Sequence, residues 1–187
     1  MIETATPKSK PKASLALILA LLLTASFALA SEKTSMRFDR LTMDDGLSQS
    51  SVAAITQDEA GFMWFATESG LDRFDGFNFR HYHHESGNDR SLANNFARDI
   101  ARAADGSLWV ATDGGGVSRW LPETDDFVTY RHDPDNDASL ADDHIRTILP
   151  DARGYVWVGT RDSGLDRLHV ATGAVTHYTH DVENTGS

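Results

Sequence analysis

One pattern occurs three times along this chain, and an internal repeat limits the possible folds more than any other feature of a sequence. Each copy centres on a tryptophan, and Trp64, Trp109 and Trp157 lie 45 and 48 residues apart. The copies read GFMWFATESGLDRFDGFNFRHY (Gly61–Tyr82), GSLWVATDGGGVSRWLPETDDFVTY (Gly106–Tyr130) and GYVWVGTRDSGLDRLHVATGAVTHY (Gly154–Tyr178). Other positions keep their spacing from the tryptophan, namely a leucine seventeen before (Leu47, Leu92, Leu140), an isoleucine nine before (Ile55, Ile100, Ile148) and a threonine three after (Thr67, Thr112, Thr160). Such agreement indicates repeated units of one supersecondary structure.

Each unit has the sequence features of four short strands. In the first unit the β-branched and aromatic stretches between turn signals are residues 51–58, 63–68, 71–74 and 79–82. Asp58 and Gly61 suit the first and fourth positions of a type I turn, a pattern that the third unit repeats and the second alters at Ala103. No segment after residue 30 has a helical period. We therefore predict an all-β fold of β-propeller blades, each a four-stranded antiparallel sheet.

The strands that carry the three tryptophans are apolar on both faces. They read MWFAT, LWVAT and VWVGT, whereas a strand with one solvated face would alternate apolar and polar residues. Both faces of each sheet should therefore be covered by neighbouring blades, with the tryptophans in the core. The small residues Ala66, Ala111 and Gly159 share one register and should let neighbouring sheets approach closely. Trp120 lies outside the tryptophan register, so we expect it to be exposed.

The motif G-x-x-W-x-[AG]-T, followed in two copies by G-L-D-R, resembles the two-component regulator propeller repeat over Phe38–Ser187. The resemblance implies the exported sensor propeller of a membrane-bound histidine kinase, often a hybrid one, or of a diguanylate cyclase. Our first hypothesis is a binding module whose ligand, a small molecule or a saccharide, is bound by loops of several blades at one open end of the completed ring. The resemblance also implies an output domain beyond this chain, and no catalytic residue within it.

The N-terminus has the three parts of a secretory signal peptide. Residues 1–12 are basic, and residues 13–30 form an apolar run that ends in the small-residue sequence Ala28-Leu29-Ala30. We expect cleavage after Ala30, which places the mature protein outside the cytoplasm, in the periplasm, with the full-length protein anchored in the inner membrane. An uncleaved membrane anchor is the alternative, although eighteen residues is close to the lower limit for a span.

The repeats divide the rest of the chain. We assign residues 31–50 to an N-terminal outer strand and linker, and the three full blades to residues 51–84, 92–132 and 140–180. Arg37–Leu41 should be a closing strand that pairs with the last blade of a complete ring.

Residues 181–187 align with Asp133–Ser139, so we expect a linker to a fourth repeat. Three blades are too few for a ring, since propellers have about 4–8. The predicted architecture is therefore an incomplete ring, the N-terminal part of a longer protein. A ring of several chains is the alternative, and the open edge of the third blade allows self-association.

Charge and cysteine content exclude several partners. Without residues 1–30 the chain keeps 14 basic and 27 acidic residues, a net charge of −13. Nucleic acid and anionic lipid should be repelled by such a domain. The chain has no cysteine, so disulfides and thiol chemistry are excluded, and stability must come from packed apolar surface.

The histidines do not predict a metal site, and we expect neither a metal nor a cofactor. His84, His132 and His180 share one register, and His81 and His177 share another, so equivalent histidines should lie on different blades and diverge. The acidic stretch 133–144 resembles a calcium loop at its start, but Ala138 replaces the glycine at position six and His144 the glutamate at position twelve.

No catalytic constellation is present either. The serines lack a nucleophile elbow, the glycine run lacks the lysine of a phosphate loop, and the acidic pairs lie in loops where carboxylates are usually solvated. These residues are Ser48, Ser50, Ser51, Gly114–Gly116, Asp44–Asp45, Asp125–Asp126 and Asp142–Asp143. Two other function classes stay open at this point, an exported propeller lyase or glycosidase and a scaffold that binds proteins.

Overall fold

The computed structural model describes residues 38–180. The chain divides into two units between Arg40 and Leu41, and the described part of the first unit, residues 38–40, has no helix or strand. The predicted signal peptide at 1–30 and the predicted linker at 181–187 lie outside the described residues. Residues 38–180 include no helix that is long and apolar enough to cross a membrane.

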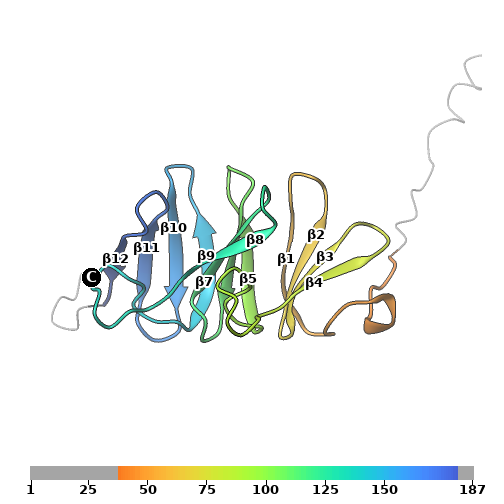
Figure 1. The fold of residues 1–187 in the computed structure, drawn as a ribbon, viewed down its shortest axis with the longest axis horizontal. Coiled ribbons are helices and arrows are strands. Elements are labelled where there is room, and N and C mark those ends of the chain that lie inside the picture. Colours follow the sequence, from red (N-terminus) through yellow and green to blue (C-terminus); the bar gives the residue numbers. More distant parts are fainter. Residues whose placement is uncertain (1–37, 181–187) are drawn as a thin grey trace, which may run out of the picture. The chain divides into compact units, whose positions relative to one another are not determined.

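The second unit contains three four-stranded antiparallel sheets (Figure 1). Blade 1 consists of β1 (Val52–Gln57), β2 (Met63–Thr67), β3 (Gly70–Phe74) and β4 (Phe79–Tyr82). Blade 2 consists of β5 (Ala97–Arg102), β6 (Leu108–Thr112), β7 (Val117–Leu121) and β8 (Asp126–Tyr130). Blade 3 consists of β9 (Ile145–Pro150), β10 (Tyr155–Thr160), β11 (Leu165–His169) and β12 (Val175–Tyr178). Each sheet follows chain order, which confirms the predicted fold class, and the described residues form no closed ring. A single turn of 3-10 helix, η1 (Met43–Asp45), precedes blade 1.

The turns between the first two strands have similar backbone hydrogen bonds in blades 1 and 2, and in blade 1 the turn also holds a core side chain. The amide of Gly61 donates to the carbonyl of Asp58 over 3.2 Å, and that of Gly106 donates to Ala103 over the same distance. In blade 1 the carboxylate of Asp58 accepts hydrogen bonds from the Phe62 amide (2.9 Å) and from the Trp64 indole N–H (2.7 Å). The turn residue therefore fixes the orientation of the buried tryptophan.

Blades 1 and 2 pack through an aromatic core that we call joint A. Trp64 is fully buried, and its ring lies 5.1 Å from that of Tyr82 and 4.7 Å from that of Trp120. The expectation that Trp120 is exposed was wrong, because only 4% of its surface is accessible. Joint A comprises Trp64, Ala66, Leu71 and Tyr82 of blade 1 with Leu92, Ala97, Ile100, Leu108, Val110, Trp120 and Phe127.

Blades 2 and 3 pack through a mainly aliphatic core that we call joint B. It comprises Trp109, Ala111 and Val117 of blade 2 with Leu140, Ile145, Ile148, Val156, Val158 and Leu168. Trp109 stacks on Tyr130 of its own blade at 5.5 Å, and the opposing sheet presents no aromatic ring to it among these residues. At the equivalent of Trp120, blade 3 has Leu168, which is fully buried.

The outermost faces of the three-blade unit stay open. Ile55 is 55% exposed, whereas Ile100 and Ile148, at the same register, are 5% and 4% exposed because the preceding blade covers them. On the far face of blade 3, Leu165 and Tyr178 are 38% and 42% exposed. The same repeat position is thus buried or exposed according to whether a neighbouring blade lies against it.

The small residues of the tryptophan strands do not all serve the expected purpose. Ala66 and Ala111 are fully buried in joints A and B, as expected for a close approach of sheets. A side chain at Gly159, however, would meet Cγ2 of Thr147 at 2.7 Å. Thr147 lies on β9 of the same blade, so this glycine is required by its own sheet.

The predicted closing strand at Arg37–Leu41 is not observed as a strand. Its described residues, 38–41, have no strand structure, and the side chain of Phe38 is 87% exposed. The last blade of a ring, which would be its partner, is not among the described residues, so a closing role stays a prediction for a complete propeller.

Candidate functional site

The linker that enters each blade is tied down by one side chain of that blade's third strand. The residue after the repeat leucine donates its amide to a buried acceptor on β3, β7 or β11. These pairs are Ser48 to Asp72 (2.8 Å), Ala93 to Ser118 (3.0 Å) and Ala141 to Asp166 (2.8 Å). All three acceptors are fully buried, so the position is polar because a backbone amide needs a partner there.

In blades 1 and 3 the buried acceptor is an aspartate that also holds a histidine. His81 Nδ1 lies 2.6 Å from Asp72 Oδ1, and His177 Nδ1 lies 2.6 Å from Asp166 Oδ1. The hydrogen bond to Asp166 raises the pKa of His177 above its ordinary value. Blade 2 lacks this pair, because Thr129 stands in the histidine register.

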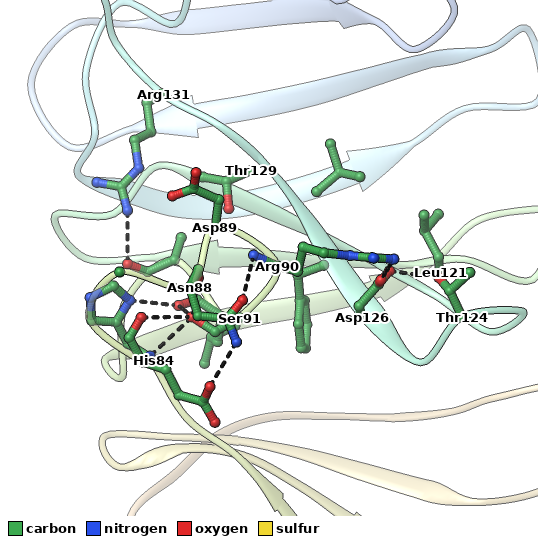
Figure 2. Close-up of a pocket in the computed structure, with 16 residues that line it drawn as sticks. His84, Asn88, Asp89, Arg90, Ser91, Leu121, Thr124, Asp126, Thr129 and Arg131 are labelled. Atoms are coloured by element: carbon green, nitrogen blue, oxygen red, sulfur yellow. Dashed lines mark hydrogen bonds and ion pairs between the residues drawn. The ribbon is translucent and has the colours of Figure 1, made fainter.

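A pocket of about 590 Å³ lies where blade 2 lacks the histidine (Figure 2). One wall is the linker at residues 84–93, which joins β4 to β5, and the other is the outer strand β8 with its flanking turns. The amide of Phe127 on β8 donates to the carbonyl of Arg90 over 3.0 Å, which fixes the spacing of the two walls. The volume lies within the range of small-molecule sites.

Several polar groups of this pocket are already paired with one another. Arg90 forms an ion pair with Asp126, which also accepts a hydrogen bond from the Thr124 hydroxyl over 2.6 Å. Arg131 donates one guanidinium N–H to the carbonyl of Ala93 over 3.0 Å. Figure 2 shows these contacts as dashed lines on the rim of the pocket.

Two lining residues keep unused hydrogen-bonding capacity. Within residues 38–180 Asp89 has no hydrogen-bond or ion-pair partner, and Arg131 has no carboxylate partner.

The sequence analysis did not predict this pocket. The signal that marks it is the exchange of G-L-D-R for G-V-S-R and of F-R-H-Y for F-V-T-Y in the second copy.

A second polar cluster joins blades 2 and 3 at the start of their first strands. Arg98 on β5 donates to Asp113 over 2.7 Å, and Arg161 of blade 3 lies 3.7 Å from the same carboxylate. The hydrogen bond from Arg98 keeps the pKa of Asp113 below its ordinary value. His144 bonds Asp142 at 2.9 Å beside them. Because these charges neutralise one another, the cluster serves as a tie between blades.

His84 and His132, which share one register of the repeat, bond to backbone carbonyl groups. His84 Nδ1 lies 2.9 Å from the carbonyl of Leu92, and His132 Nδ1 lies 2.7 Å from that of Leu140. Each therefore fastens its own linker. Residues 38–180 contain no group of three or more histidine or carboxylate side chains placed to hold a metal ion.

The acidic stretch 133–144 folds back on itself as a linker. Asp133 Oδ1 accepts the amide of Asp135 over 3.0 Å, and the Ser139 hydroxyl donates to the carbonyl of Asp133 over 3.1 Å. The Asp133 carboxylate thus bonds within the loop.

Most of the serines and glycines considered as catalytic candidates in the sequence have structural partners. Ser48 donates to Asp72, Ser50 to Gln49, and the amides of Gly114 and Gly116 to the carbonyl of Asp143. The acid pairs are not all solvated as expected. Asp125 accepts hydrogen bonds from the Tyr82 hydroxyl (2.8 Å) and the Trp120 indole (3.0 Å). The two donors lie on different blades, so this carboxylate joins them.

Comparison with known proteins identifies the repeat. Residues 46–69, 91–114 and 139–162 match the family described as two component regulator propeller. A stretch of 68 residues is 37% identical to Histidine kinase P4 of Formosa agariphila, over 36% of this chain and 5% of that protein. The chain thus matches only a small part of this relative.

Two solved structures have the same architecture. The extracellular domain of the hybrid two component system BT3049 from B. thetaiotaomicron superposes with a TM-score of 0.71 at 34% identity, over 75% of this chain and 20% of that one. A streptogramin B lyase superposes with a TM-score of 0.51 at 20% identity, over 71% of this chain and 42% of that one. The second likeness is one of fold alone.

Proposed function

Because the chain carries three two-component regulator propeller repeats, we propose that it is part of the extracytoplasmic sensory propeller of a membrane-bound signalling protein, a histidine kinase or hybrid kinase. The observation that carries the proposal is the superposition on an extracellular domain of a hybrid two component system at 34% identity. Ligand would shift the propeller between two arrangements, by no more than its difference in affinity for them.

The output domain decides between a kinase and a diguanylate cyclase, and the gene can be read for it. We expect the reading frame to continue past codon 187 with further W-x-[AG]-T repeats, a membrane span and a kinase domain. A cyclase domain would move the sensor to the alternative output. A stop codon directly after Ser187 would remove the effector and overturn the proposal.

Export can be tested separately from output. Alkaline phosphatase fused after Ser187 folds to its active form outside the cytoplasm, so the fusion should be active in a bacterial host. Deletion of residues 1–30 should abolish the activity, and N-terminal sequencing of the exported fusion should begin at Ser31. Activity that survives the deletion would contradict the assignment of the signal peptide.

We also infer that further blades of the same repeat type cover the two open faces. The support is that the side chains exposed on these faces occupy repeat positions whose equivalents are buried in joints A and B.

Ile100→Ala should lower the free energy of unfolding by about 2–4 kcal/mol, as for a core isoleucine. Ile55→Ala should cost less than about 1 kcal/mol in this chain and as much as Ile100→Ala once a blade covers it. Urea unfolding of both variants, in this chain and in a longer chain that includes the further blades, measures the two losses of stability. Equal costs for Ile55→Ala in the two chains would refute the inference.

A further inference from the structure

The space beside β8 has a counterpart at the next joint, and the comparison shows which groups differ. At joint B, His177 extends from Asp166 to the linker, where its Nε2 lies 3.0 Å from the backbone carbonyl of Asp137. The linker and β12 line two grooves there, of about 240 and 250 Å³, and His177 lines the second.

At joint A the corresponding space is one continuous pocket of about 590 Å³. Ser118 and Thr129 replace the aspartate and the histidine, and Ser118 keeps only the bond to the linker amide of Ala93. The residue in the register of Asp137 is Asp89, which has no partner within residues 38–180. Joint A therefore has no imidazole between the third strand and the linker, and the carboxylate of Asp89, which lines the same pocket, stays unpaired within the described residues.

The opposite side of this space offers a cation. Arg131 lines the same pocket, uses one N–H for the Ala93 carbonyl and has no carboxylate partner. Of the other charged residues of the pocket, Arg90 pairs with Asp126, whereas Glu85 keeps its negative charge and accepts a hydrogen bond from the Asn88 amide at 2.7 Å. Asp89, Thr129 and Arg131 all line this pocket and are labelled in Figure 2.

We propose that this pocket binds a small zwitterion, an α-amino acid with free amino and carboxylate groups. The ammonium group bonds to the carboxylate of Asp89. The carboxylate takes the remaining N–H groups of Arg131, whose planar fork suits a carboxylate. Thr129 lines the same pocket and offers its hydroxyl as a further polar contact. A ligand with a single charge would leave one of the two groups unpaired.

The experiment is calorimetric titration of the purified chain with free L-amino acids, one at a time, each compared with its N-acetyl and its amide derivative. At least one free amino acid should bind saturably. Each derivative, which lacks one of the two charges, should bind about tenfold or more weakly, the effect of losing a charge-assisted hydrogen bond. Absence of saturable binding across the panel, or equal binding of the derivatives, would overturn the proposal.

Variants place the binding in this pocket. Asp89→Asn and Arg131→Gln, both at exposed positions, should each weaken binding about tenfold or more without loss of the folded circular dichroism spectrum. The double variant Ser118→Asp, Thr129→His, which recreates joint B, should fill the pocket and abolish binding.

The matched control is Asp166→Ser, His177→Thr, which opens the other groove and should leave the original affinity unchanged. Binding that survives both Asp89→Asn and Arg131→Gln would refute the site. The proposal concerns binding alone, so its failure would leave the sensory role to be judged by the export and output experiments.

Discussion

Joints A and B are built from the same repeat by different chemistry. In joint A, the rings of Trp64, Tyr82 and Trp120 pack together, and Asp125 accepts hydrogen bonds from Tyr82 and Trp120. In joint B, Trp109 shares a core with aliphatic side chains such as Leu168. Joint A thus has the more aromatic core, and its linker borders one pocket of about 590 Å³, where joint B has two grooves of about 240 and 250 Å³.

The difference shows which parts of a repeat are free to vary. The tryptophan, the strand register and the tie between linker and third strand are the same at both joints. The positions of Trp120, Asp125, Ser118 and Thr129 vary, and they decide how each blade recognises its neighbour and where space remains. A few exchanges on a fixed backbone can therefore give each joint its own partner and its own ligand chemistry.

Among the changes that distinguish joint A from joint B, truncation of Trp120 should have the largest effect on stability. Trp120→Ala removes a ring packed against Trp64 at 4.7 Å and should lower the free energy of unfolding by about 3–5 kcal/mol. At joint B, Leu168→Ala should cost about 2–4 kcal/mol. Urea denaturation followed by far-UV circular dichroism measures both. Val128→Ala, on an exposed side chain of β8, is the control and should change stability by less than about 0.5 kcal/mol. If Trp120→Ala lowered the free energy of unfolding by less than Leu168→Ala, the aromatic core would not contribute more to joint A than the aliphatic core does to joint B.

Asp125 is the next most informative position, because it combines backbone strain with contacts between blades. Its φ of 55° lies in the left-handed region, where blade 3 has Gly173 with a φ of 75°. Asp125→Gly relieves strain but leaves the Tyr82 hydroxyl and the Trp120 indole without their acceptor, and we expect a net loss of about 1–3 kcal/mol.

The reciprocal change tests the same idea at joint B. Gly173→Asp introduces the strain without the aromatic donors and should cost about 1 kcal/mol. Thermal unfolding of both variants decides between strain and contacts. A gain in stability from Asp125→Gly would show that strain outweighs the contacts of the carboxylate at joint A.

Periodicity predicted the backbone of this molecule well. The spacing of the three tryptophans was enough to predict three four-stranded sheets, since strand length, turn residues and apolar character are local properties of the sequence. Trp64 and Trp109 are buried as expected, whereas Trp157 of blade 3 is only partly buried, because no blade covers the far face of that sheet. Trp120 was misjudged because a register that varies between copies gives no information about what the neighbouring blade presents to it.

The polar contacts could not be predicted for the same reason. Asp125 lies 43 positions from Tyr82, and nothing in a loop sequence shows that its carboxylate meets a hydroxyl of another blade. The pocket depends on two exchanges, at Ser118 and Thr129, whose side chains come together only through the pairing of β7 with β8. A sequence pattern can mark such exchanges, but only the folded joint shows that they open a space.

Stability at joint B should depend on pH through His177. The hydrogen bond to Asp166 raises the pKa of His177 above 6.5, so the protonated form stabilises the folded state. This contribution is complete below pH 6.5 and is lost as the pH rises through the higher folded-state pKa. The midpoint of urea unfolding of the wild-type chain should therefore fall more over this interval than that of Asp166→Ser, His177→Thr. Identical slopes for the two proteins would show that His177 does not contribute.

The smallest expected effect is that of an exposed ion pair found at joint A. Arg102 Nη1 on β5 lies 3.4 Å from Glu59 Oε1 in the first turn of blade 1, and both side chains are about half exposed. Joint B has Pro150 in the register of Arg102, so it has no such pair at this position. Because water screens exposed charges, Arg102→Gln should cost only about 0.2–1 kcal/mol, and the cost should vanish in molar salt. A double-mutant cycle with Glu59→Gln, measured at low and high salt, isolates the coupling. A coupling energy that persists at high salt would mean that the pair is held by packing against blade 2, and joint A would then extend to the turns at its edge.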